Sequence, residues 1–115
     1  MKKLALVCLI VMCGISCLAR ATDCTGKVDL IGSGINGDVV VRGPGGLQPI
    51  YVCNLMATTA NGTSVEVCST WYSNLLAAYS SASDVTIAIP GSAACDSFQG
   101  WQYTTGVTWV FSRKD

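Results

Sequence analysis

The sequence predicts a small, mainly β domain with one helix, stabilised by disulfide bonds. Short β-branched segments alternate with turns rich in Gly and Pro, as in antiparallel sheets. Only residues 70–81 change to the spacing of a helix. An even number of cysteines, four, remains once the first 21 residues are set aside, which is typical of a disulfide framework in a short exported chain.

Residues 1–21 have the layout of a secretory signal peptide. Lys2-Lys3 precedes an apolar run from Leu4 to Leu18, and Ala19-Arg20-Ala21 offers small residues for cleavage. The run is shorter than the roughly 20 residues that span a bilayer. We therefore predict cleavage after Ala21, a secreted or periplasmic location and no membrane span. Lipidation of Cys17 is the alternative interpretation of the same segment.

Residues 22–115 are predicted to form one domain with an acidic balance of charge. They number 115 − 21 = 94, and they keep four Lys or Arg against seven Asp or Glu, a formal charge of 4 − 7 = −3. No basic patch remains, so we expect no nucleic acid partner. A domain this short buries a modest core, which disulfide bonds would help to stabilise.

Strand and turn signals alternate through residues 27–68. Residues 27–31 alternate and meet Gly32-Ser33-Gly34, where a bend or bulge is expected. The β-branched segment DVVVR at 38–42 predicts a strand, and GPGG at 43–46 ends it. Residues 50–56 and 63–68 are predicted to be the two strands of a hairpin around Asn61-Gly62, a pair that favours a tight turn.

One helix is predicted over residues 70–81. Trp71, Leu75, Ala78 and Tyr79 recur at helical spacing, and Ser69 or Thr70 stands where an N-cap is expected. Residues 85–89 then predict a strand that ends at Pro90-Gly91. Residues 92–106 are expected to form an ordered loop holding at most a short strand, and 107–112 the last strand.

This order of elements favours an OB-fold, a small antiparallel barrel. A helix lying between the third and fourth strands of a five-stranded barrel is the arrangement that defines this fold. A general α+β sheet covered by one helix fits the same pattern of elements. Residues 22–115 are accordingly predicted to be a single OB-like domain.

The four remaining cysteines are Cys24, Cys53, Cys68 and Cys95, and they allow three pairings. No metal or cofactor is expected, because the chain has no His and no C-x-x-C pair. A two-residue turn at Asn61-Gly62 would leave Cys53 and Cys68 diagonal, roughly 7 to 8 Å apart. A disulfide spans about 4.4 to 6.8 Å between Cα atoms. A bond between these two cysteines therefore requires a longer loop or a bulge.

The available side chains favour binding over catalysis. Without His, no Ser-His or Cys-His nucleophile pair can form, and the acidic residues occur singly. Polar residues separate Phe98, Trp101 and Tyr103, which combines flat apolar surface with hydrogen-bonding groups, as in a sugar site. Trp101, beside Gly100, fits binding and packing equally well, whereas Trp109 lies in a strand and is expected to pack in the core.

Three segments resemble the B subunits of subtilase cytotoxin and of the typhoid and pertussis-like AB5 toxins. They are PIYVC, ANGTSVEVC and AAYSSASDVTI, within residues 49–89. The family has a Tyr-Phe-Cys strand, a second Cys at nearly the same distance, and a helix running into Tyr-Ser-Thr-Gly and a Val-Arg-Ile strand. The resemblance implies an OB-fold, a ring-forming subunit that binds sialylated glycans, and a Cys53–Cys68 disulfide. That pairing leaves Cys24 for Cys95.

The family holds its sugar partly with a Ser near the start of the first long strand and a Tyr after the helix. The resemblance places Ser33 or Asn36 at the first position and Ile89, which cannot hydrogen-bond, at the second. Together with the aromatic segment, this predicts a ligand-binding set of Ser33, Asn36, Gln99, Trp101 and Tyr103.

We therefore expect a non-catalytic binding module for a glycan on a host or neighbouring cell surface, assembled as a homo-oligomer. The first alternative is an oligomeric accessory or inhibitory subunit without a small ligand. The second alternative is a hydrolase that uses carboxylates.

Overall fold

The computed structural model describes residues 21–104 and 106–113. The predicted signal peptide, apart from Ala21, and the alternative lipidation at Cys17 lie outside this range. The described strands are β1 (Ala21–Lys27), β2 (Leu30–Ser33), β3 (Asp38–Arg42), β4 (Ile50–Asn54), β5 (Asp84–Pro90) and β6 (Trp109–Arg113). The α-helix α2 (Val65–Ser81) lies between β4 and β5, and the short 3-10 turns are η1 (Pro44–Gly46) and η2 (Cys95–Ser97).

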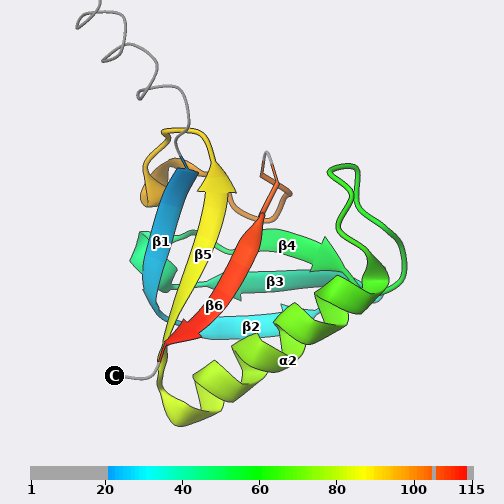
Figure 1. Cartoon of the computed structure of the whole chain (residues 1–115), viewed down its shortest axis with the longest axis horizontal. Coiled ribbons are helices and arrows are strands. Elements are labelled where there is room, and N and C mark those ends of the chain that lie inside the picture. The colour runs from blue at the N-terminus through cyan, green and yellow to red at the C-terminus, as the bar shows by residue number, and fades with distance from the viewer. Residues whose placement is uncertain (1–20, 105, 114–115) are drawn as a thin grey trace, which may run out of the picture.

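The strands form two antiparallel sheets of three strands, in the orders β1-β5-β6 and β2-β3-β4. The strands of the two sheets run across one another, and α2 lies diagonally along one side of them (Figure 1). The helix contacts β2 and β4 of one sheet and β5 and β6 of the other. The prediction of a mainly β domain with one helix is thus confirmed. The described strands do not close into a single barrel, so the OB-fold stays a hypothesis.

One hydrophobic core joins the two sheets and the helix. Alternation along β3 and β5 turns their apolar side chains inward, and α2 adds a buried stripe at helical spacing. The innermost side chains include Val39 and Val41 of β3, Ile87 and Ile89 of β5, and Leu75 of α2, all fully buried. The outward positions of the same strands are therefore left for the surface.

The helix begins five residues earlier than predicted, so the strand expected at 63–68 is wrong. Ser64 is the N-cap, and its side-chain oxygen accepts a hydrogen bond from the Val67 N–H at 3.2 Å. Glu66 places a negative charge in the first turn, where the helix dipole favours it. The β-branched Val65 and Val67 suggested a strand, but buried Cys68 stands three residues before Trp71 and continues the helical stripe.

Both expected disulfide bonds are present. Cys53 bonds to Cys68 with 5.5 Å between their Cα atoms, and Cys24 bonds to Cys95 with 5.7 Å. The hairpin expected around Asn61-Gly62 does not form, and the chain instead turns at Ala60-Asn61, where the Gly62 N–H donates to the Thr59 carbonyl at 2.9 Å. A helix follows this turn, so the Cys53–Cys68 bond joins strand β4 to helix α2. The requirement for a longer loop or a bulge, which applied to two paired strands, therefore does not arise.

Two further features at the chain ends differ from expectation. The polar segment ATDCTGK forms β1, which pairs with β5 along its whole length and was not predicted. The prediction that Trp109 packs in the core is wrong. Trp109 is 60% exposed and stacks on Phe111, with 5.4 Å between ring centroids. Val110 between them takes the buried position instead, as alternation along a strand requires.

Substitution of the observed N-cap, Ser64, and of the predicted one, Ser69, tests where the helix begins. We expect Ser64→Ala to lower the free energy of unfolding by about 1 kcal/mol, because the Val67 N–H loses its partner. Ser69→Ala, inside the helix and exposed, should raise it by up to about 0.5 kcal/mol, since Ala has the higher helix propensity. Urea denaturation followed by circular dichroism measures both. Greater destabilisation by Ser69→Ala would contradict this assignment.

Candidate functional site

The outward face of the β2-β3-β4 sheet is organised by the strand register. Gly32 of β2 opposes Val40 of β3, and Val40 opposes Tyr51 of β4. A parallel bridge then pairs Tyr51 with Tyr103, outside the regular strands. Opposed residues share a face, so these four positions form a row across the sheet on the side away from the core.

Residues 101–103 are held against the edge of β4 by backbone hydrogen bonds. The Trp101 N–H donates to the Pro49 carbonyl at 2.5 Å, and the Tyr51 N–H donates to the Gln102 carbonyl at 3.0 Å. The rings of Tyr51 and Tyr103 meet edge to face, with 5.3 Å between centroids. Residues 101–103 belong to no regular strand, but these contacts hold them in place along the edge of β4.

A first depression, the Trp101 depression, lies on this face and has a volume of about 440 Å³. Its lining includes Gly32 and Val40, the aromatic residues Tyr51 and Trp101, and Ser33 and Asn36 from the end of β2 and the turn after it. A Cβ atom at Gly32 would meet nothing within 4 Å, so the strand is bare at this point. The Trp101 side chain is 61% exposed.

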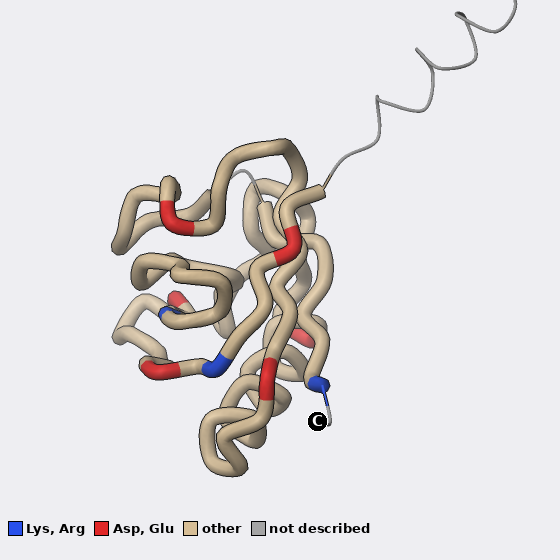
Figure 2. Tube along the Cα trace, turned by 90° about the vertical axis from the view of Figure 1, so that its left-hand side faces the viewer, with Lys and Arg blue, Asp and Glu red and all other residues tan. Residues whose placement is uncertain are grey.

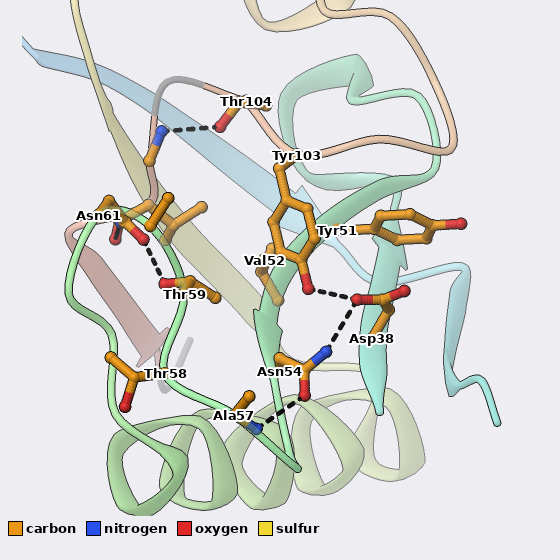
Figure 3. Close-up of a pocket in the computed structure, with 13 residues that line it drawn as sticks. Asp38, Tyr51, Val52, Asn54, Ala57, Thr58, Thr59, Asn61, Tyr103 and Thr104 are labelled. Atoms are coloured by element: carbon orange, nitrogen blue, oxygen red, sulfur yellow. Dashed lines mark hydrogen bonds between the residues drawn. The ribbon is translucent and has the colours of Figure 1, made fainter. Parts of the chain in front are cut away.

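A second depression, the Tyr103 depression, lies beside the first and has a volume of about 580 Å³ (Figure 3). Asp38, Tyr51 and Tyr103 border it on one side, and residues 57–61 border it on the other. Asp38 and Tyr51 line both depressions, which are therefore neighbours across these two side chains.

A hydrogen-bond network fixes Asp38 at this shared border. The Tyr103 hydroxyl and the Asn54 amide nitrogen both donate to Oδ1 of Asp38, the latter at 3.0 Å. The Asn54 side-chain oxygen accepts from the backbone N–H groups of Met56 and Ala57, at 2.7 and 3.0 Å. Within the described chain no hydrogen bond reaches Oδ2 of Asp38, and this oxygen points away from Asn54 in Figure 3.

Burial raises the pKa of the Tyr103 phenol to about 12, and the hydrogen bond to Asp38 acts in the same direction. Deprotonation would remove the donor and place a second negative charge beside the carboxylate. Tyr103 therefore remains a neutral hydrogen-bond donor to Asp38 at physiological pH.

The structure brings together three of the five predicted site residues. Ser33, Asn36 and Trp101 line the Trp101 depression, and Tyr103 lines the adjoining one. Gln99 lines neither, and its side-chain oxygen accepts from the Gln102 amide at 3.2 Å.

Sequence reasoning missed Asp38 and Tyr51, which border both depressions. The alternation of DVVVR contained a signal for Asp38. Its outward position follows once the buried side chains of Val39 and Val41 are assigned to the core.

The fold and this surface define a small disulfide-bonded β domain with an open, aromatic-walled depression. Neither protein-family models nor curated proteins nor solved structures gave a match to the chain. The resemblance to AB5 toxin B subunits therefore stays a hypothesis.

The described residues also bear on metals and membranes. Residues 21–104 and 106–113 contain no group of three or more His, Cys, Asp or Glu suited to a metal ion. Over the same range, no helix is long and apolar enough to cross a bilayer.

The raised pKa of Tyr103 predicts a late transition in a spectrophotometric titration of the tyrosines. Because the folded pKa exceeds the ordinary value of about 10, the folded state binds the extra proton between about pH 10 and 12. This group should leave stability unchanged below pH 10 and lower it as the pH rises through that window. Tyr103→Phe should remove the transition, and Asp38→Asn should move it to lower pH. An unaltered late transition in Tyr103→Phe would contradict the assignment.

Proposed function

We propose that this chain is a secreted, non-catalytic glycan-binding module and that the sugar binds in the Trp101 depression. One observation carries the proposal. Trp101 and Tyr51 supply two aromatic residues to the lining of one depression, together with the bare strand position at Gly32 and with Ser33 and Asn36 from the end of β2 and the turn after it. A sugar ring stacks its C–H face on such rings while fixed polar groups orient its hydroxyls.

The backbone at Trp101 supports a binding role for this residue. Its φ of 60° lies in the left-handed region, which a bulky side chain rarely occupies. Such a conformation costs of order 1–3 kcal/mol and persists where surrounding contacts impose it, often at ligand sites. Here the Trp101 N–H is bonded to the Pro49 carbonyl, and the indole is exposed in the lining of the depression.

The lining residues support binding without catalysis. Hydrolysis of a glycosidic bond ordinarily uses a pair of carboxyl groups on opposite sides of that bond. Asp38 is the one acidic side chain among the described residues that line either depression. The chain also lacks His as an alternative base. A sugar in this site would be held without a second carboxylate to complete the acid–base pair.

A relationship to the AB5 toxin B subunits, and with it homo-oligomeric assembly, forms the finer part of this proposal. Among the described strands, β2 and β6 each pair with a neighbour on one side only. Such edges can accept a strand of another copy. A glycan on a host or neighbouring cell surface is the proposed target of the assembled module.

The second candidate is an interaction subunit that has no small ligand. The exposed, stacked pair of Trp109 and Phe111 on the edge strand β6 favours it. Exposed aromatic side chains are enriched where proteins bind one another. Sedimentation of the purified chain, combined with the sugar titration below, separates this candidate from the first.

Two matched aromatic residues test the glycan site. Trp101 and Trp109 are 61% and 60% exposed, but only Trp101 lines the depression. After a glycan array identifies a bound oligosaccharide, we expect Trp101→Ala to weaken its solution affinity about tenfold or more, because the stacking surface is lost. Trp109→Ala should stay within about twofold. Calorimetry with the free oligosaccharide removes avidity from the comparison, and equal losses in both variants would contradict the site.

Filling the bare strand position provides a second test that leaves the aromatic rings in place. Gly32 has room for a Cβ atom and lies in a strand, where a β-branched residue is favoured. We expect Gly32→Val to keep the thermal unfolding midpoint at or above that of the wild type. The same variant should lose sugar binding in calorimetry, because its methyl groups occupy the depression. A folded Gly32→Val protein with wild-type affinity would place the sugar elsewhere.

A further inference from the structure

The charge of the two depressions indicates which class of glycan they accept. We infer that the ligand is a neutral glycan and that Asp38 discriminates against sialylated glycans, the class that the toxin resemblance implies. This inference rests on the proposed glycan-binding function and adds the chemical class of the sugar. It follows from the described charges, hydrogen bonds and strand register on this face of the sheet.

Asp38 is the one charged side chain among the described residues that line either depression. The nearest basic residue on the same face by register is Arg42, which opposes Leu30 at the far end of the strand pair. Its Nε lies 2.5 Å from Oδ1 of Asp29, so an ion pair already neutralises it. The few basic positions of the described chain are interspersed with acidic ones in Figure 2 and form no patch. An anionic sugar would therefore meet a carboxylate without a compensating cation.

The partners of Asp38 hold its charge in place without neutralising it. Tyr103 and Asn54 are neutral donors, and both bond to Oδ1. Rotation of the carboxylate away from the depressions would break both hydrogen bonds. Oδ2 accepts no hydrogen bond from the described residues and suits a hydroxyl donor of a neutral sugar.

Two backbone N–H groups of the neighbouring turn are already engaged within the turn. A carboxylate can bind to convergent N–H groups as well as to a cation. In the turn between β2 and β3, however, the Gly34 N–H donates to the Asp38 carbonyl and the Gly37 N–H donates to the Gly34 carbonyl, both at 3.0 Å. These N–H groups stabilise the turn itself. The lining of the Trp101 depression also includes Asn36, Tyr51 and Trp101, whose neutral amide, hydroxyl and indole N–H groups suit sugar hydroxyls.

The experiment compares two oligosaccharides that differ in one charged unit. A lactose-based oligosaccharide and its counterpart carrying a terminal sialic acid are titrated into the folded chain by calorimetry, in low and in high salt. We expect the neutral oligosaccharide to bind at least tenfold more tightly in low salt. Because exposed charges are screened by ions, the ratio of affinities should shrink as salt is added.

The D38N variant tests the residue itself. It retains an oxygen that can accept from Tyr103 and removes the charge, so the ratio of the two affinities should fall to within about threefold. D23N provides the matched control, because Asp23 carries the same charge on an exposed position of β1 in the other sheet. It should leave the ratio unchanged.

The outcomes are distinguishable. Equal or tighter binding of the sialylated oligosaccharide by the wild-type chain would overturn the inference while leaving the glycan-binding function standing. A preference for the neutral sugar that does not respond to salt would also overturn it, even if D38N failed to fold. Absence of binding to both oligosaccharides and to a broad glycan array would remove the proposed function, and this inference with it.

Discussion

The Cys53–Cys68 disulfide ties the second sheet to the helix, and the arrangement of the surface depends on it. Cys53 lies near the end of β4 and is fully buried, so its bond fixes which way this strand faces. The register of β4 against β3 shifts between Val39 and Val40. A bulge of this kind re-aims the side chains that follow it. In consequence Tyr51 opposes Val40 and Asn54 opposes Asp38 on the outward face, where the depressions lie.

The second disulfide and the edge of β4 explain how an irregular segment can present a binding surface. In the segment of residues 95–103, the Cys24–Cys95 bond anchors the start to β1, and backbone hydrogen bonds at Trp101 and Gln102 anchor the end to β4. A loop held at both ends loses little further conformational entropy when a ligand binds, which favours affinity. The exposed indole of Trp101 therefore has a defined position although no regular element contains it.

Elements with strong local signals were predictable from the sequence, and those that depend on tertiary pairing were not. The strand DVVVR at 38–42 was predicted with its observed bounds, because its β-branched run meets a clear turn. The start of α2 was missed because Val65 and Val67 favour a strand locally, while the cap at Ser64 and the buried position of Cys68 favour the helix. Ser33, Asn36 and Trp101 were predicted and line one depression. The outward position of Asp38 follows from the local alternation of DVVVR, but that of Tyr51 required the bulged register, which no local pattern encodes.

The same strands supply the core and the ligand surface, on opposite faces. Along β3, Val39 and Val41 pack inward, while Asp38 and Val40 face the depressions. Inward substitutions act on stability through packing, whereas outward ones change shape and charge with little effect on the core. A scaffold of this kind can therefore keep its disulfides and core while its ligand changes. A fold resembling a sialic acid binder thus does not by itself determine the sugar, and the fixed charge of Asp38 is the stronger guide to its class.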